Sequence, residues 1–369
     1  MTASGPTMCR ICGSDRTEAL GVDSFLVPAT SFAPEIHEYE NRICAGCGVV
    51  FGHPAIDGDR LREIYASDYW TTIHALELGG RRIDLPLDFD VGPLSFRRVR
   101  GFFETVTRVA VRIPSVVPTA HDLVIDYGAY QGLFLHGVHQ LWGCRCLAYD
   151  HNATGIEFAR RILGFAESRV ATNILTDTFG ERAKYVTALH TLEHLNDPVA
   201  FLEHVRTNVL ATEGFLYVEV PNLYGFPLND PLHLYSYSPD SLSRLFARAG
   251  FETVETATSG FPPRPDFLCQ NDAEYLIGLA RPASSGTSVP VGGVDVATIR
   301  RSVRRSWRRH VWGGIRRQFK RAARESARFV YYLGFAGFLE AISPALALGI
   351  ARRLGLRRRP TDRPPVSSR

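Results

Sequence analysis

Apolar and polar positions alternate along the middle of the chain as strands and helices alternate in a layered protein. From residue 122 onward, short apolar runs are separated by stretches with helical spacing, which predicts a parallel sheet with crossover helices. We expect seven strands, at Leu123–Tyr127, Arg145–Asp150, Arg169–Asn173, Lys184–His190, Phe215–Pro221, Phe251–Thr258 and Tyr275–Ala280. The fold class is therefore α/β, and residues 122–281 are expected to form one complete domain.

Helical spacing of apolar residues, with capping residues at its ends, predicts helices between and before these strands. They are expected at Asp59–Tyr65, Ser95–Ile113, Ala153–Leu163, Pro198–Val209 and Pro239–Ala249. Residues 61–121 are interpreted as a helical connector that caps the domain on its acceptor side.

A different pattern begins near the C-terminal end. Residues 282–298 are rich in Ser, Gly and Pro and are expected to form a flexible linker. Residues 299–369 follow as a basic tail, in which apolar residues recur every four positions and predict an amphipathic helix. These apolar residues are Ile299, Val303, Trp307, Val311, Ile315 and Phe319.

Charge separates the tail from the body. The 369 residues carry a formal net charge of +4, but residues 281–369 hold 20 basic and 4 acidic side chains, so the first 280 residues are at −12. The tail, not the body, is expected to meet phosphate groups. Its continuous apolar residues favour an anionic membrane surface, contacted by residues 299–359, over nucleic acid. Docking of the tail on the body or on a second subunit is a third alternative.

Composition narrows the class of protein. A chain with 45% hydrophobic residues is not disordered or collagen-like. Seven unevenly placed cysteines do not suit a secreted disulfide scaffold, and the first residues lack the apolar core of a secretory signal. We therefore expect a cytoplasmic protein whose tail can bring it to a membrane.

Four cysteines near the N-terminus have the spacing of metal ligands. Cys9 and Cys12 form one pair, Cys44 and Cys47 form another, and a glycine follows each pair. Two residues between ligands let a tight turn direct both sulfur atoms at one ion, which indicates a tetrahedral Zn²⁺ site. Four thiolates fill the coordination shell, so residues 1–60 are expected to form a structural zinc-binding module, with a hairpin between the pairs.

A glycine turn follows the first predicted strand of the α/β domain. Asp126 lies near the end of this strand, and Gly128 and Gly132 come directly after it. Glycines between a strand and a helix let the backbone approach a nucleotide-like ligand. Asp150, 24 positions after Asp126, is the last residue of the second strand. A carboxylate at this position can bind both hydroxyls of a ribose. A dinucleotide oxidoreductase would carry a fuller Gly-x-Gly-x-x-Gly motif, whereas Tyr130 stands at the middle position here.

This arrangement resembles the class I S-adenosylmethionine-dependent methyltransferases, which have a Rossmann-like seven-stranded sheet. The segment His190-Thr-Leu-Glu193-His194-Leu-Asn-Asp197-Pro198 is similar to one in the subfamily that includes the ubiquinone-pathway O-methyltransferases. With the cysteine pairs, the chain resembles the zinc-containing deoxysugar C-methyltransferases over residues 8–280.

The resemblance implies roles for individual residues. Those implied to contact S-adenosylmethionine are Asp126, Gly128 and Gly132 at its methionine end, Asp150 at its ribose, Asn173 at its adenine, and His190 beside its sulfonium. Two positions depart from the family pattern: Tyr130 replaces a central glycine, and Leu232 stands where the sugar C-methyltransferases carry a glutamate before histidine.

Methyl transfer to a hydroxyl or a carbon acid needs a base as well as positioning, and histidine suits this role. His233 is the first candidate and His194 the second, with Glu193 beside it. His194 could instead organise, with Glu193 and Asp197, the turn before the next helix. Aromatic residues that could wall the acceptor pocket are Tyr65, Tyr69 and Trp70.

The leading hypothesis is a zinc-containing, S-adenosylmethionine-dependent methyltransferase. Its small-molecule acceptor would be a sugar-containing compound, such as a nucleotide sugar or glycan precursor, or another envelope or secondary-metabolite precursor, methylated on a hydroxyl or a carbon. One alternative is an RNA methyltransferase that uses the zinc module and the tail. Against it, no Asn/Asp-Pro-Pro-Tyr motif follows the fourth strand. The other alternative is a membrane-tethered, non-catalytic module with a vestigial cofactor site, suggested by Tyr130 and Leu232.

Overall fold

The structure is a computed structural model that describes residues 7–20, 40–66, 93–225, 232–260, 273–284, 293–306 and 308. The chain divides into two compact units, and every described residue except Arg308 belongs to the larger one. Tyr69, Trp70 and the side chain of Tyr65 lie outside the described residues, as does most of the tail.

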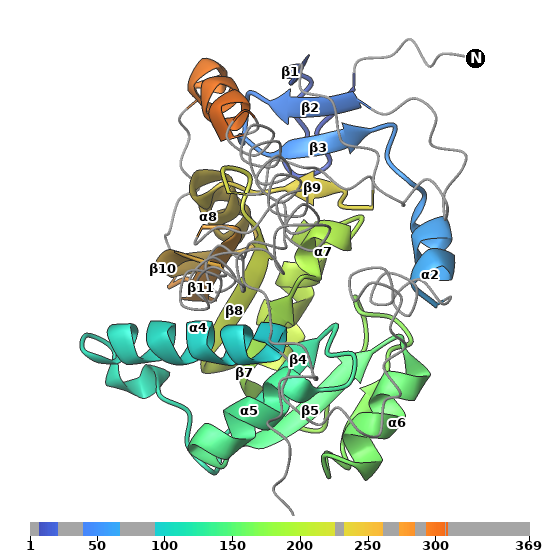
Figure 1. The fold of residues 1–369 in the computed structure, drawn as a ribbon, viewed down its shortest axis with the longest axis vertical. Coiled ribbons are helices and arrows are strands. Elements are labelled where there is room, and N and C mark those ends of the chain that lie inside the picture. The colour runs from blue at the N-terminus through green and yellow to red at the C-terminus, as the bar shows by residue number, and fades with distance from the viewer. Residues whose placement is uncertain are drawn as a thin grey trace, which may run out of the picture. The chain divides into compact units, whose positions relative to one another are not determined.

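A seven-stranded sheet forms the centre of the larger unit (Figure 1). Its spatial order is β10-β11-β8-β7-β4-β5-β6. The strands are β4 (Leu123–Tyr127), β5 (Arg145–Asp150), β6 (Arg169–Val170), β7 (Ala183–Leu189), β8 (Leu210–Pro221), β10 (Phe251–Ser259) and β11 (Tyr275–Pro282). β11 runs antiparallel to β8 and β10, and the other neighbours are parallel. The predicted α/β fold with a seven-stranded sheet is confirmed.

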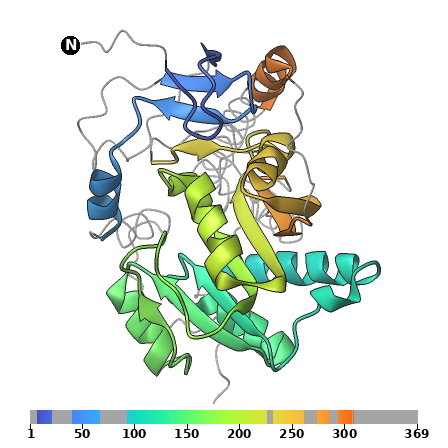
Figure 2. The same ribbon diagram turned by 180° about the vertical axis from the view of Figure 1, so that it is seen from behind.

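Helices cover both faces of this sheet (Figure 2). One face packs against α4 (Pro93–Ala110), α5 (Leu133–Trp142) and α6 (Ala153–Arg161). The other packs against α7 (Pro198–His204) and α8 (Pro239–Arg248). Phe102 of α4 anchors the first face, because its ring meets those of four neighbours at centroid distances from 4.8 to 5.7 Å. Burial on both faces explains the nearly continuous apolar strands in the sequence.

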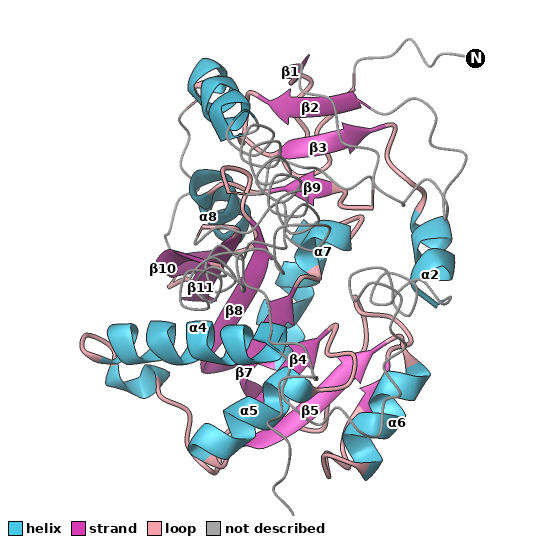
Figure 3. Cartoon of the chain, viewed as in Figure 1, coloured by secondary structure: helices cyan, strands magenta, loops and turns pink. Residues whose placement is uncertain are grey.

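A smaller, four-stranded sheet forms in the part of the chain that carries the two cysteine pairs (Figure 3). Its antiparallel strands are β1 (Thr17–Ala19), β2 (Glu40–Cys44), β3 (Val50–His53) and β9 (Tyr235–Ser236), and α2 (Gly58–Ala66) follows β3. We call residues 7–20 and 40–66 the cysteine module. β1 and β2 pair across the segment between the two cysteine pairs, in agreement with the predicted hairpin. β9 comes from a distant part of the chain, which the sequence analysis did not anticipate.

Several elements end earlier than the sequence predicts, among them β6 and the helix predicted at Pro198–Val209. β6 stops at Val170, and Asn173 lies beyond it in a turn. The carboxylate of Asp177 accepts a hydrogen bond from the backbone N–H of Asn173 at 3.1 Å, and the Asp177 N–H donates to the Asn173 carbonyl at 2.8 Å. These bonds turn the chain away from the sheet edge. The helix predicted at Pro198–Val209 is helical in the α form only to His204 and ends in a π-helical turn, η3 (Val205–Val209).

The start of the tail is docked on the cysteine module. Residues 296–306 are helical, and Ile299 and Val303 are 5% and 1% exposed, in a cluster with Leu20, Ile43, Val50 and Leu223. Arg300 forms an ion pair with Glu18 at 2.8 Å. Val294, within the predicted linker, packs against the same cluster. The first residues of the predicted amphipathic stripe therefore face protein, which corrects their interpretation as membrane-facing.

Within the described part of the chain, the helices are all too short or too polar to cross a bilayer.

Candidate functional site

The four cysteine sulfur atoms converge in the cysteine module. The Sγ atoms of Cys9 and Cys47 are 3.7 Å apart, those of Cys12 and Cys44 are 3.4 Å apart, and all four lie within 4.8 Å of one another. Each pair is followed by a glycine with positive φ, Gly13 at 71° and Gly48 at 77°, which lets the chain turn back tightly.

This geometry fits a zinc ion. Four sulfur atoms about 2.3 Å from one tetrahedral ion would be separated by about 3.8 Å, close to the observed spacing. The backbone N–H of Gly46 also donates to Sγ of Cys44 at 3.3 Å, and such a bond supports a thiolate ligand. Cys9, Cys12, Cys44 and Cys47 are thus placed together as the sequence predicts, in an arrangement suited to a structural metal.

The glycine turn after β4 lies where the strand order of the large sheet reverses. β4 is flanked by β5 on one side and by β7 on the other, and a crevice at the carboxyl ends of the strands is the usual ligand site at such a point. Gly128 and Gly132 have φ values of 77° and 75°. A Cβ on Gly128 would lie 2.2 Å from Oγ1 of Thr191, so only glycine fits this position.

Tyr130 adopts a left-handed backbone, with φ of 49°, which costs a non-glycine residue about 1–2 kcal/mol. Its N–H donates to Oδ2 of Asp150 at 2.7 Å, and the N–H of Asn152 donates to Oδ1 of the same carboxylate at 2.7 Å. Asp150 therefore holds the turn after β4 against the end of β5. Burial raises the pKa of Asp150 above its ordinary value despite these bonds.

Asp126 is buried beneath the same turn. Its Oδ1 accepts a hydrogen bond from Oγ1 of Thr187 on β7 at 2.6 Å, and 2% of the residue is exposed. Burial raises the pKa of Asp126 to about 7, against the lowering effects of Thr187 and of the nearby Arg98. This carboxyl group is therefore close to its titration midpoint at neutral pH, and a cation beside it would shift it to the ionised form.

His190 follows the end of β7 and is held between two buried carboxylates. Its Nδ1 lies 3.3 Å from Oε1 of Glu193, and its Nε2 lies 3.2 Å from Oε1 of Glu219. Burial alone would lower the pKa of His190, but these two glutamates outweigh it and raise the pKa. The backbone φ of 55° makes His190 the second strained residue at this edge of the sheet.

An arginine that the sequence analysis did not single out completes this network. Arg97 on α4 is 2% exposed, and its guanidinium binds both oxygens of Glu219, with Nη1 donating to Oε2 at 2.8 Å. It also lies 4.0 Å above the ring of Tyr275. Burial would raise the pKa of Glu219, but His190 and Arg97 lower it well below its ordinary range.

A second arginine points to the same carboxylate, since Nε of Arg98 is 3.5 Å from Oε1 of Glu219. Two adjacent arginines near the N-terminal end of a helix are a signal that was present in the sequence. A buried guanidinium group needs an anionic partner, so such a pair on a helix that packs against the sheet calls for nearby carboxylates.

The three predicted catalytic residues are brought together. Rings of His194 and His233 have centroids 4.8 Å apart, and Nε2 of His194 is 4.0 Å from Oε1 of Glu193. Burial raises the pKa of Glu193, but His190 and His194 outweigh it and lower the pKa to about 2. Ligand atoms of these three residues lie within 4.8 Å of one another, close enough to share one ligand or ion.

The tautomer of His194 follows from its other partner. Its Nδ1 lies 3.0 Å from the carbonyl oxygen of Leu232, which can only accept, so the neutral ring carries its hydrogen on Nδ1. The lone pair is then on Nε2, the nitrogen that faces Glu193. Leu232, whose side chain is buried, thus fixes a predicted base through its backbone.

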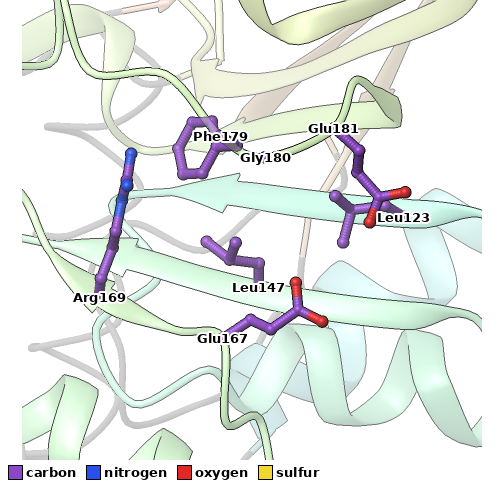
Figure 4. Close-up of a pocket in the computed structure, with 7 residues that line it drawn as sticks. All are labelled: Leu123, Leu147, Glu167, Arg169, Phe179, Gly180 and Glu181. Atoms are coloured by element: carbon purple, nitrogen blue, oxygen red, sulfur yellow. The ribbon is translucent and has the colours of Figure 1, made fainter.

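A cavity of about 510 Å³ lies elsewhere on the large sheet (Figure 4). It is lined by Leu123, Leu147, Glu167, Arg169, Phe179, Gly180 and Glu181. Leu123 and Arg169 begin their strands, whereas Gly128, Asp150 and His190 lie at or directly beyond the carboxyl ends of theirs. Both glutamates are paired with Arg145, so this cavity is separate from the candidate site.

Comparison with protein families gives a match over residues 104–256 to a family model described as a methyltransferase domain. No curated protein matches the chain.

Several solved structures are similar in fold. An S-adenosylmethionine-dependent methyltransferase from Clostridium acetobutylicum is 10% identical, with 59% of this chain and 100% of that one covered and a TM-score of 0.40. Magnesium protoporphyrin IX methyltransferase from Synechocystis is 13% identical, with 62% and 100% covered and a TM-score of 0.41. A glycopeptide N-methyltransferase in complex with sinefungin is 13% identical, with 50% and 87% covered and a TM-score of 0.38.

Proposed function

We propose that this chain, a methyltransferase whose methyltransferase domain spans residues 104–256, transfers the methyl group of S-adenosylmethionine to a hydroxyl or carbon of a small-molecule acceptor. The proposed acceptor is a sugar-containing compound, such as a nucleotide sugar or glycan precursor, or another envelope or secondary-metabolite precursor. One observation carries this proposal. The histidine pair and the glycine turn are joined through Thr191, whose Oγ1 donates to the carbonyl of Tyr127 at 2.9 Å.

The cofactor would supply a methyl group on a positively charged sulfur. On the chain's side, Asp126 offers a carboxylate to the amino group at its methionine end, and Arg98 offers a cation to the carboxylate there. Each oxygen of Asp150 accepts one backbone N–H and keeps a second lone pair, which suits the two hydroxyls of a ribose. The residues present therefore fit this cofactor.

Asn173, which the family resemblance pairs with adenine, has a different position from the one expected. It lies in the turn after β6 rather than at the end of that strand, and its Oδ1 accepts a hydrogen bond from the N–H of Leu175 at 3.0 Å. Its amide group remains a proposed adenine contact, now supplied by a turn.

The chain's own chemistry is to remove a proton and to align the acceptor. An acceptor hydroxyl donates its proton to the ring of His233 or of His194, and the charge of Glu193 stabilises the imidazolium that forms. A positioned base contributes about 10²–10⁴ in rate. Alignment of donor and acceptor contributes about 7–11 kcal/mol.

Zinc is proposed as a structural ion bound by the four cysteines. We retain an anionic membrane surface as a proposed partner of the tail, within residues 299–359. Because Ile299 and Val303 are docked on protein, the proposed membrane contact lies in later parts of the tail. Within this proposal the protein remains cytoplasmic, with its tail at the membrane.

The test is transfer of an isotope-labelled methyl group from S-adenosylmethionine to a panel of nucleotide sugars, glycan precursors and total RNA. With the native chain we expect label in a small-molecule product. With the His194→Ala/His233→Ala double variant we expect almost no label there. Label in RNA alone would favour the RNA methyltransferase. Cofactor binding without transfer to any acceptor would favour the non-catalytic module.

A further inference from the structure

The cysteine module contacts both chain segments that carry the candidate bases. Backbone pairing gives the first contact: β9 is the fourth strand of the module's sheet, with Val50 opposite Ser236 and Phe51 opposite Tyr235. The N–H of Gly52 also donates to the carbonyl of Leu234 at 3.4 Å. β9 begins two residues after His233, so its pairing with the module's sheet fixes the position of the segment that carries this histidine.

Side chains give the second contact. Arg10 lies between Cys9 and Cys12 in the first metal-binding turn, and its Nη1 donates to Oδ1 of Asn196 at 3.1 Å. Asn196 is two residues after His194. The hydroxyl of Tyr235 donates to the carbonyl of the same Asn196 at 3.1 Å. The turn that carries His194 is therefore tied both to the metal-binding turn and to β9.

The two segments are also joined to each other. Leu232 binds Nδ1 of His194 through its carbonyl, and the two histidine rings are in edge contact. Cys9 and Cys47 belong to the same buried apolar cluster as Leu232 and Tyr237, so this arrangement shares one core with the metal ligands.

The cofactor side is held in a different way. The turn after β4 is held by elements of the large sheet: the N–H of Gly128 donates to the carbonyl of Tyr149 at 2.9 Å, the N–H of Tyr130 donates to Asp150 at 2.7 Å, and Oγ1 of Thr191 donates to the carbonyl of Tyr127 at 2.9 Å. These bonds join neighbouring strands of the large sheet and involve no residue of the cysteine module.

We propose that the metal-loaded cysteine module is the scaffold that positions the acceptor-side histidines, with Arg10 and Asn196 as positioning residues. This inference rests on the proposed function in taking His194 and His233 as the acceptor-side bases. Metal loss would loosen residues 194–197 and 232–237 together, while the cofactor turn keeps its own bonds. The module thus does more than stabilise the N-terminal part of the chain, because it sets the geometry of proton removal.

Hydrogen exchange with and without the metal tests this directly. The full chain is compared before and after chelation, with cofactor binding measured on both samples by calorimetry. We expect exchange over 232–237 and 194–197 to quicken at least about tenfold, while exchange over 123–130 and the dissociation constant for S-adenosylmethionine change less than about threefold.

A second variant keeps the test decisive if chelation unfolds the chain. Arg10→Ala leaves all four cysteines in place, and Arg16→Ala, another exposed arginine of the module, is its matched control. With full zinc content, Arg10→Ala should quicken exchange over 194–197 and lower the rate of methyl transfer, leaving cofactor affinity unchanged, whereas Arg16→Ala should do neither.

Two outcomes would overturn the proposal. One is unchanged exchange over both segments in the metal-free chain and in Arg10→Ala. The other is loss of cofactor binding together with faster exchange of residues 194–197 and 232–237. In that case the module would stabilise the fold in general rather than the acceptor side. A native chain that fails to bind S-adenosylmethionine would instead refute the proposed function, and the exchange result would still decide whether the module holds these segments.

Discussion

The two sides of the candidate site are assembled in opposite ways. On the cofactor side, Asp126, Gly128, Tyr130 and Asp150 lie within 25 residues of sequence, and the N–H groups of Gly128 and Tyr130 bind the end of the adjacent parallel strand at Tyr149 and Asp150. On the acceptor side, His194 and His233 come from distant segments that contact each other and are both held by a third, the cysteine module.

This difference indicates how the protein divides its tasks. A local turn between strands is enough to present backbone groups to a cofactor that the chain shares with many enzymes. A base and an acceptor pocket need side chains from several elements, and in our proposal a metal-stabilised module holds them. Changes on one side should therefore leave the other largely intact, and the following experiments test that separation.

The largest effect is expected on turnover. Replacement of both bases, in His194→Ala/His233→Ala, should lower the rate of methyl transfer by about 10²–10⁴, because proton removal is lost. Cofactor affinity should stay within about twofold of native, as measured by calorimetry, since the two replaced side chains lie on the acceptor side of the proposed site. The exposed His121→Ala is the matched control. Native turnover in the double variant would show that neither histidine is the base.

The next effect is on cofactor affinity. Asp150→Ala removes the acceptor for the N–H groups of Tyr130 and Asn152 as well as the proposed ribose ligand, so we expect affinity for S-adenosylmethionine to fall about 10- to 100-fold. Hydrogen exchange of residues 232–237, on the acceptor side, should not change. Asp150→Asn, which keeps one acceptor oxygen, should lose less. Equal affinity of the alanine variant and the native chain would remove Asp150 from the cofactor site.

A smaller effect is expected from pH. Burial holds the pKa of Asp126 at about 7, so the free carboxyl is mostly neutral at pH 6 and mostly ionised at pH 7.5. The proposed contact with a cationic amino group requires the ionised form, so binding releases a proton and affinity should rise with pH, by about eightfold over this interval. In Asp126→Asn the rise should disappear. If the affinity of the native chain for S-adenosylmethionine fell as the pH rose, Asp126 would not be the group that binds the amino group.

The smallest effect on the site is expected from the docked tail helix. Val303→Asp places a charge in the cluster with Leu20 and Ile43, so residues 293–306 should become accessible to proteases. Cofactor affinity should change less than about twofold, because the cluster does not include the large sheet. Val111→Asp, at a valine that is 89% exposed, is the control. Equal protease resistance in both variants would argue against the docking.

Much of the fold was predictable from the sequence, because its elements are determined by local patterns. The seven strands alternate with helices at lengths that only a layered sheet satisfies, and the boundaries of β4 and β5 are those expected. β6 was predicted three residues too long, since the bonds that turn the chain away come from Asp177, a residue beyond the strand.

Contacts between distant segments were harder to predict. The stripe that begins with Ile299 and Val303 has the spacing of a membrane-facing helix, and nothing in that spacing distinguishes a lipid surface from the apolar face of the cysteine module. The pairing of β3 with β9 was likewise invisible, because a two-residue strand has no periodicity. Arg97 and Glu219 form an ion pair across 122 residues, which a single sequence does not reveal.

The candidate site was predictable where chemistry depends on residue type and spacing. The four cysteines lie together as expected, since metal ligands leave a recognisable spacing. His194 and His233 were expected only as separate candidate bases, and their ring contact is a finding of the structure. Tyr130 looked like an obstacle in the sequence. In the structure its backbone takes the left-handed conformation that glycine adopts most readily, and its N–H still reaches Asp150.

Calorimetric titration of the zinc-loaded full chain with S-adenosylmethionine, with a reduced nicotinamide cofactor titrated in parallel, decides whether the glycine turn binds the proposed cofactor. We expect saturable binding of S-adenosylmethionine in the micromolar range, at one molecule per chain, and no heat from the nicotinamide. A folded, zinc-loaded sample that gives no binding heat with S-adenosylmethionine would contradict this expectation.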